Sequence, residues 1–169
     1  MHYVYKTMKS PVGKLKLVAS DEGLAAILWE NDDPSRVRLS TTVENNTYPV
    51  LLETERQLHE YFEGKRRSFS LDFTLVGTDF QKRVWQALLT IPFGETWSYG
   101  QLAQRIGDAK ASRAVGAANR KNPLSIVVPC HRVIGTSGKL TGFAGGLEVK
   151  ARLLALESKS GQRKEMEQS

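Results

Sequence analysis

A cysteine followed directly by a histidine is the clearest chemical signal in this sequence of 169 residues. Cys130 lies between Pro129 and His131, and Arg132 follows them. The nucleophilic form of cysteine is the thiolate, whereas an ordinary thiol, with a pKa of about 8.5, is mostly protonated at neutral pH. His131 is placed to take up that proton, directly or through a water molecule. The pair therefore indicates nucleophilic chemistry, although a lone cysteine is more commonly a small core residue.

A histidine base usually needs a third group that holds its ring in one tautomer. Glu157, at the end of the last expected helix, is a candidate for this orienting carboxylate. The alternative is an ordinary surface carboxylate at a helix end, and the spacing alone leaves open whether Glu157 reaches His131.

Metal and disulfide chemistry are disfavoured by residue counts. Cys130 is the only cysteine, which excludes an internal disulfide and a zinc site built on several cysteines. The three histidines, His2, His59 and His131, are far apart and show no ligand spacing. We therefore expect no metal and no cofactor.

The elements that must position these groups fall into two halves, and the fold class is α/β. Residues 1–76 are predicted to form a small N-terminal α/β domain with antiparallel strands. Polar residues 31–48 are expected to be irregular. The predicted strands are residues 2–9, 14–19, 24–29 and 69–75, and the predicted helix is residues 50–62.

Residues 77–157 are predicted to form a mostly helical C-terminal domain, followed by a disordered polar tail over residues 158–169. Thr78 or Asp79 and then Ser98 are candidate helix N-caps. The predicted helices begin near 79, 99, 110 and 147 and end near 89, 106, 120 and 156.

The two central short helices resemble a helix-turn-helix DNA-binding motif. The second, residues 111–120, consists mostly of small residues and carries basic ones, so it can approach a nucleic-acid groove closely. A helix packed tightly against a neighbour is the alternative.

Charge is unevenly distributed between the two halves: residues 1–76 hold 10 Lys/Arg and 11 Asp/Glu, whereas residues 77–169 hold 14 Lys/Arg and 7 Asp/Glu. This excess suits a polyanionic partner, and equally a solvated surface.

Membrane insertion and secretion are not indicated. No apolar run approaches the roughly 20 residues of a membrane span, and the N-terminus lacks the apolar segment of a signal peptide. We expect a cytoplasmic protein.

Several dispersed motifs over residues 78–157 resemble the O6-alkylguanine-DNA alkyltransferases, also called methylated-DNA–protein-cysteine methyltransferases. The matching segments are Phe80-Gln81, Val84-Trp85, Ile91-Pro92, Gly94, Ser98 to Ala103, Ala114 to Asn119, Asn122-Pro123, Ile126 to Ile134, Gly142 to Leu147, Lys150 and Leu153-Leu154. The resemblance implies a suicide enzyme that repairs DNA in one turnover. It would move a methyl or other alkyl group from O6-alkylguanine onto Cys130, with O4-alkylthymine as a further lesion left open.

The resemblance also implies roles for four catalytic residues. Cys130 would accept the alkyl group, and His131 would deprotonate it through a water. Glu157 would orient His131, and Asn122 would bridge the recognition helix and the active-site loop.

For the lesion, the resemblance implies that the nucleotide is flipped out of the stack, since a stacked base hides its O6 substituent. Tyr99 would help to rotate the nucleotide and would donate a hydrogen bond to the leaving guanine. The backbone at Val133 and Ala144 would contact the base edges, with Phe143 beside them.

For the DNA, the resemblance implies minor-groove binding through the helix of small residues. Arg113 would fill the gap that the flipped base leaves, with Ala114, Arg120 and Lys121 as further contacts. We expect a monomer and leave cooperative binding on DNA open.

Two departures from the family pattern stand out. Many members have a tyrosine at the position of Phe143, and some bind zinc through N-terminal cysteines that this chain lacks. Two other functions compete with alkyl transfer: a module of the same fold that binds lesions without repairing them, and a cysteine hydrolase. Cys130 itself argues against the first.

Overall fold

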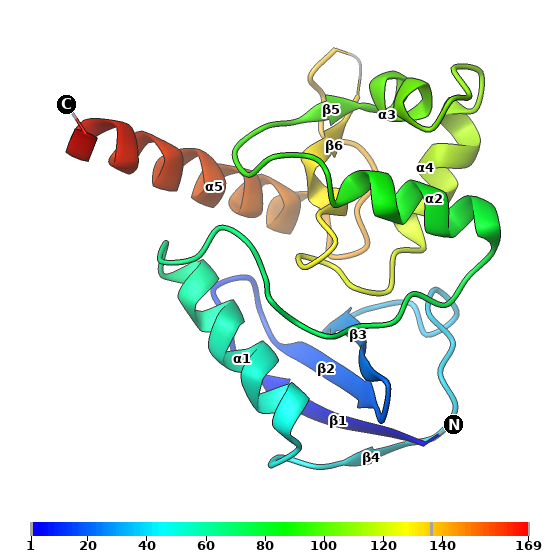
Figure 1. Ribbon diagram of the computed structural model, residues 1–169, viewed down its shortest axis with the longest axis vertical. Helices are drawn as coiled ribbons and strands as arrows, with labels where there is room; N and C mark the ends of the chain where they lie inside the picture. The colour runs from blue at the N-terminus through cyan, green and yellow to red at the C-terminus, as the bar shows by residue number, and fades with distance from the viewer. Residues whose placement is uncertain (1, 136, 169) are drawn as a thin grey trace.

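The computed structural model describes residues 2–135 and 137–168, with side chains described as far as Ser158. An N-terminal sheet covered by one helix lies below a group of C-terminal helices (Figure 1). The elements are β1 (Tyr3–Met8), β2 (Leu15–Ser20), β3 (Gly23–Trp29), β4 (Thr42–Glu44), α1 (Pro49–Phe62), α2 (Asp79–Leu88), β5 (Trp97–Ser98), α3 (Tyr99–Arg105), α4 (Ser112–Arg120), a 3-10 turn (Cys130–Arg132), β6 (Val133–Ile134) and α5 (Leu147–Gln168).

The N-terminal sheet has the strand order β3-β2-β1-β4. The predicted antiparallel hairpins are confirmed, because β1 pairs with β2 and β2 with β3 in antiparallel fashion. A fourth strand that the sequence did not indicate, β4, pairs with β1 in parallel. α1 packs on this sheet and buries Leu51 and Leu58 against it.

The prediction of a strand over residues 69–75 is wrong, because the segment forms only an isolated bridge. The segment touches the sheet at a single bridge, between Leu24 and Phe73. Leu24 N donates to Asp72 O (2.8 Å) and Thr74 N donates to Leu24 O (3.1 Å). Its alternating Phe and Leu side chains are partly buried on the core, which produces the strand-like pattern without a ladder of backbone pairs.

The predicted N-caps of the C-terminal helices are confirmed by geometry. The Thr78 side chain accepts from Gln81 N and that of Ser98 from Gln101 N, and both glutamines complete capping boxes. After α3, Gly107 adopts a φ of 84°, a conformation that glycine reaches at no steric cost. α3 and α4 then pack together, with the predicted helix-turn-helix arrangement.

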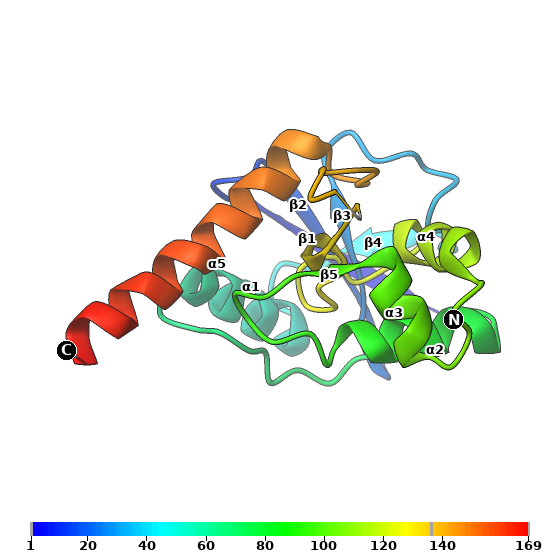
Figure 2. The ribbon, with the colours of Figure 1, turned by 90° about the horizontal axis from the view of Figure 1, so that it is seen from above.

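α5 is longer than predicted. Its backbone remains helical to Gln168, whereas we expected it to end at Leu156 and a disordered tail to follow. The segment is polar but rich in Lys, Arg, Glu and Gln, which favour helices, so polarity alone did not distinguish a solvated helix from disorder. Figure 2 shows the last turns of α5 extending away from the rest of the chain.

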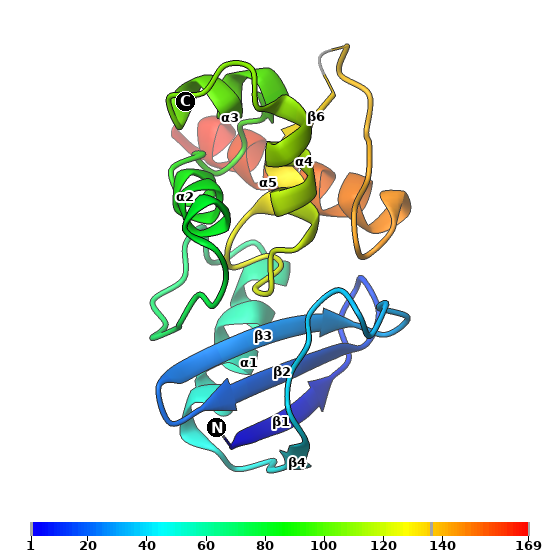
Figure 3. The same ribbon diagram turned by 90° about the vertical axis from the view of Figure 1, so that its right-hand side faces the viewer.

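The two halves meet where the strand β3 runs past the segment that leads to Cys130 (Figure 3). Ile27 N donates to Pro123 O (2.9 Å), and the Trp29 indole donates to Ser125 Oγ (3.2 Å). Within that segment Ile126 has a φ of 76°, which is unusual for a β-branched residue. The hydrophobic core continues across this junction, so the N-terminal sheet supports the loop that carries the nucleophile.

Candidate active site

Cys130 opens a tight 3-10 turn and is almost completely buried, with 4% of its surface exposed. Its backbone N–H donates to Val128 O (2.8 Å). Its carbonyl accepts from the Asn119 amide on α4 (3.3 Å), a contact that sequence reasoning did not foresee. The backbone of the nucleophile is thus held directly by the helix predicted to bind DNA.

Asn122 lies at the end of α4 and joins this helix to the loop before Cys130. Its Nδ2 donates to Val128 O (2.8 Å), and its Oδ1 accepts from Leu124 N (3.0 Å). The side chain is fully buried. These hydrogen bonds hold the segment before Cys130 against the residues that follow α4.

Glu157 reaches His131, which the sequence had left open. The distance between His131 Nε2 and Glu157 Oε2 is 2.7 Å, and both side chains are buried. Arg132 Nε donates to Glu157 Oε1 (2.8 Å) and Nη2 to Oε2 (3.1 Å). A further donor is the Tyr61 hydroxyl, 2.7 Å from the same Oε2. Burial raises the pKa of Glu157, but hydrogen bonds and charges from His131 and Arg132 outweigh it and lower the pKa to about 2.

The ionised Glu157 determines which tautomer His131 adopts. A carboxylate only accepts hydrogen bonds, so Nε2 must carry the proton and Nδ1 bears the lone pair. Nδ1 is buried without a protein partner among the described residues, so it is free to accept a proton. Burial lowers the pKa of His131, and together with the charges of Arg132 and Lys150 it outweighs the opposing effect of Glu157, which keeps the ring neutral and able to act as a base.

The Cys130 thiol rests in its protonated form. Burial raises its pKa, while the Asn122 side chain and the positive charges of Arg36 and Lys150 act in the opposite direction. The thiolate therefore forms when His131 takes up the proton, rather than persisting in the free protein. The arrangement can activate one buried sulfur for attack on an electrophilic carbon.

Lys150 is a second buried cation beside the site. Its Nζ donates to the carbonyls of Val133 (2.6 Å) and Thr141 (2.9 Å), and its side chain is fully buried. Burial lowers its pKa. It therefore joins β6, the strand that follows the nucleophile, to the loop over residues 137–146. Val133 is one of the two residues whose backbone the resemblance places at the base edges.

The predicted DNA-binding residues lie on one side of α4 and at its end. Arg113, Ala114, Arg120 and Lys121 are all exposed, whereas Val115, Ala118 and Asn119 face the core. This division is the one expected of a helix that presents basic and small residues to a groove.

A groove of about 490 Å³ runs beside this face of α4, and Tyr99, Arg113, Gly116, Thr141 and others line it. Tyr99 Oη accepts from Thr141 Oγ1 (3.2 Å), which leaves the Tyr99 hydroxyl proton for another acceptor. Cys130 is not among the described residues that line the groove, in keeping with its burial.

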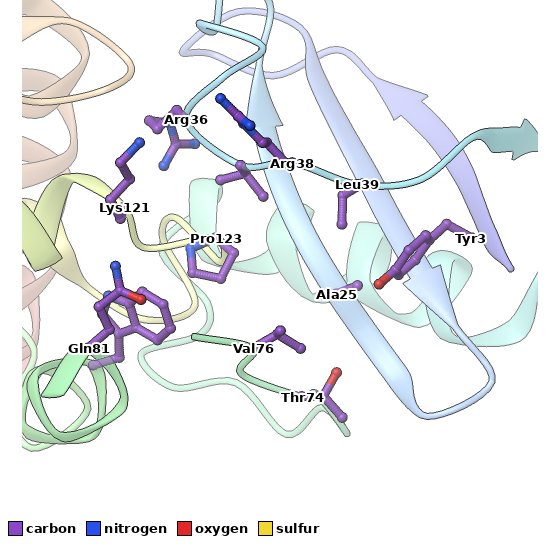
Figure 4. A pocket seen from close by; sticks show the side chains of 12 residues that line it. Tyr3, Ala25, Arg36, Arg38, Leu39, Thr74, Val76, Gln81, Lys121 and Pro123 are labelled. Atoms are coloured by element: carbon purple, nitrogen blue, oxygen red, sulfur yellow. The ribbon is translucent and has the colours of Figure 1, made fainter. Parts of the chain in front are cut away.

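A smaller cavity of about 160 Å³ separates the N-terminal sheet from the end of α4 (Figure 4). On one side of it Arg36 donates to the carbonyls of Arg120 (3.1 Å) and Asn122 (2.8 Å) while paired with Asp32. Arg36 therefore satisfies carbonyls at the C-terminus of α4, next to Lys121, and holds this end of the helix on the N-terminal half.

The loop around Phe143 and Gly145 contacts the N-terminal half through Trp29. The Phe143 and Trp29 rings make an edge contact, with centroids 5.4 Å apart. A Cβ added to Gly145 would meet Trp29 ring atoms at 2.8 Å. The sequence motif placed Phe143 and Ala144 near the base, but it could not show that Trp29 of β3 contacts Phe143 and Gly145.

Gly145→Ala is therefore expected to displace the loop or the Trp29 ring and to slow alkyl transfer. Overpacking of this kind costs about 1–3 kcal/mol of stability. The measurements are urea unfolding and single-turnover transfer. The control is Gly100→Ala on α3, whose added Cβ would meet only Ser98 Oγ at 3.8 Å. Equal effects of the two substitutions would show that close contact with Trp29 is unimportant.

Among the described residues no cluster of His, Cys, Asp and Glu could hold a metal ion. None of the helices within the described part is long and apolar enough to cross a membrane.

A buried cysteine followed by a buried histidine that is paired with a glutamate, beside a basic helix-turn-helix, is the arrangement expected of a DNA-directed protein with a cysteine nucleophile. The comparisons specify the family. The model of the 6-O-methylguanine DNA methyltransferase DNA binding domain matches residues 79–159, and that of the ribonuclease-like domain of the same enzyme matches residues 3–75. The chain belongs to the family of methylated-DNA–protein-cysteine methyltransferases.

Individual relatives agree over almost the whole chain. The methylated-DNA–protein-cysteine methyltransferase of Methanosarcina acetivorans is 47% identical over 153 residues, covering 90% of this chain and 97% of the relative. That of Mycobacterium tuberculosis H37Rv is 48% identical over 155 residues, covering 90% and 91%. A crystal structure of Mycobacterium tuberculosis OGT in complex with DNA superposes with a TM-score of 0.85 at 45% identity, covering 95% of this chain and 94% of that one.

Proposed function

We propose that this protein repairs DNA by irreversible transfer of an alkyl group from O6-alkylguanine to Cys130, once per molecule. The observation that carries the proposal is the buried His131–Glu157 pair, with His131 directly after buried Cys130 in the chain, next to the exposed basic face of α4. His131 provides a proton acceptor for the Cys130 thiol, and the neighbouring face of α4 provides a surface for DNA.

The reaction needs one bond made and one broken. As His131 Nδ1 takes the Cys130 proton, through a water, the sulfur attacks the alkyl carbon. The bond between this carbon and O6 breaks, and its electron pair goes to the guanine. Tyr99 donates a hydrogen bond to the departing base, which stabilises the developing charge. Glu157 stabilises the imidazolium formed on His131.

The DNA is bound through its minor groove, with the damaged nucleotide flipped out of the stack. Arg113 fills the gap, Ala114 allows close approach, and Arg120 and Lys121 contact phosphates. The flipped base meets the backbone at Val133 and Ala144. We further propose a monomer that acts in the cytoplasm, with domains over residues 1–76 and 77–157.

Intact-mass measurement after incubation with duplex DNA containing O6-methylguanine tests the function. The expected result is one methyl adduct per molecule, located on Cys130, with no further turnover. DNA binding without an adduct would indicate a module that only recognises lesions. Repeated turnover of an acyl substrate would indicate a cysteine hydrolase. Either result would overturn the proposal.

Arg113→Ala is expected to slow repair of duplex DNA by about 10-fold or more. Flipping a nucleotide out of the stack costs a few kcal/mol, and Arg113 no longer offsets part of this cost by filling the gap. Transfer from a free O6-alkylguanine base requires no flipping and should be unchanged. Single-turnover rates on both substrates provide the measurement, with exposed Arg105→Ala on α3 as the control. Equal losses on both substrates would assign Arg113 to the fold or the pocket.

A further inference from the structure

The N-terminal half contributes a donor to the proton relay itself. Tyr61 lies in the last turn of α1 and is 1% exposed. Its hydroxyl is 2.7 Å from Glu157 Oε2, the oxygen that also accepts from His131 Nε2 at 2.7 Å. Figure 1 shows the C-terminal end of α1 beneath α5.

We infer that Tyr61 is a positioning residue through which the N-terminal half sets the basicity of His131. The inference rests on the proposed function, because His131 must act as the base for Cys130. Tyr61 and His131 both donate to Oε2 of Glu157. The hydrogen bond from Tyr61 therefore withdraws negative charge that would otherwise stabilise the imidazolium form of His131.

The rigidity of the Tyr61 side chain supports this role. Its ring makes aromatic contacts with Phe62, Phe69 and Phe93, with centroids 5.3, 5.6 and 6.4 Å apart. Burial and the nearby Glu157 raise its pKa well above the ordinary value, so the phenol stays protonated and remains a donor. A fixed ring with a permanent proton holds Glu157 in one orientation.

Other charges act on the same groups. Arg132, on the turn with His131, donates to both oxygens of Glu157. Lys150, on α5, places a positive charge near Cys130 and His131. These cations remain when Tyr61 is changed, so Tyr61→Phe removes one neutral donor and leaves the charge of the site intact.

Tyr61→Phe is expected to move the acid limb of the pH–rate profile upward by about half a pH unit, since Glu157 then stabilises the imidazolium more strongly. The substrate is free O6-benzylguanine, whose transfer needs no duplex. Replacement of Tyr61 by 3-fluorotyrosine, a stronger donor of nearly the same shape, is expected to move the limb downward. The matched control is Tyr48→Phe, which removes a hydroxyl bound to Ser20 O in the same half.

A merely structural role would lower the rate at every pH without moving the limb. An unmoved limb, shifts of the same sign in both Tyr61 variants, or an equal shift in Tyr48→Phe would overturn the inference. NMR titration of the His131 ring in the same variants measures the shift without any reaction. The titration therefore tests Tyr61 even if the wild-type protein forms no adduct, the result that would instead refute the proposed function.

Discussion

Cys130→Ser is expected to form no detectable alkyl adduct while still binding alkylated duplex DNA. A serine hydroxyl is far less ionised than a thiol at neutral pH, and neutral His131 is too weak a base to compensate for this difference. The exposed residues of α4 are unchanged, and serine is close in size to cysteine. The measurements are intact mass after incubation with O6-methylguanine duplex and a binding titration on the same DNA.

Cys130→Ala is the companion variant, because it removes the nucleophile without adding a buried hydroxyl. Both variants should bind the duplex with affinities within about threefold of each other, since phosphate contacts dominate affinity. Transfer at the wild-type rate by either variant would place the acceptor elsewhere in the chain.

Glu157→Ala is expected to lower the free energy of unfolding by about 3–5 kcal/mol, which is the usual cost of removing one partner of a buried ion pair. The Arg132 guanidinium would be left buried without a countercharge, and Tyr61 and His131 would lose their acceptor. Urea unfolding provides the measurement. Glu148→Ala is the control, because its pairing with Arg152 at 3.5 Å on the same helix is exposed.

The same carboxylate predicts a pH dependence. The pKa of Glu157 is about 2 in the folded protein against an ordinary 4.5, so its stabilisation is present above about pH 4.5 and is lost as the pH falls toward 2. A shift of this size corresponds to about 3 kcal/mol. The stability difference between wild type and Glu157→Gln should therefore shrink between pH 5 and pH 2. A constant difference over this range would mean that Glu157 is not ionised in the folded protein.

Local chemistry made much of the fold predictable from sequence. Thr78 and Ser98 are both followed three residues later by glutamine, and both indeed start helices. The strand β4 was missed because its pairing with β1 joins segments about 40 residues apart in a polar stretch. The false strand around Phe73 shows that alternating burial does not require a ladder of backbone pairs.

The site was predictable where a motif surrounds it and hidden where it depends on distant contacts. The family motif included the positions of His131 and Glu157, and the structure brings them together. Tyr61 stands 96 residues from Glu157, in a helix whose pattern indicates only core packing. Arg132 was visible beside Cys130, but nothing in the sequence showed that it pairs with Glu157.

Of the four groups Tyr61, Cys130, His131 and Glu157, Glu157 is synthesised last. A protein grows from its N-terminus, and its early segments fold first. Tyr61, Cys130 and His131 therefore leave the ribosome before the carboxylate that His131 needs. Until α5 docks, Arg132 lacks the Glu157 carboxylate as its countercharge. Burying Arg132 unpaired would be costly, so the turn around Cys130 does not pack into the core before then. A nascent chain would thus hold its single-use sulfur unactivated until α5 has been synthesised and has docked.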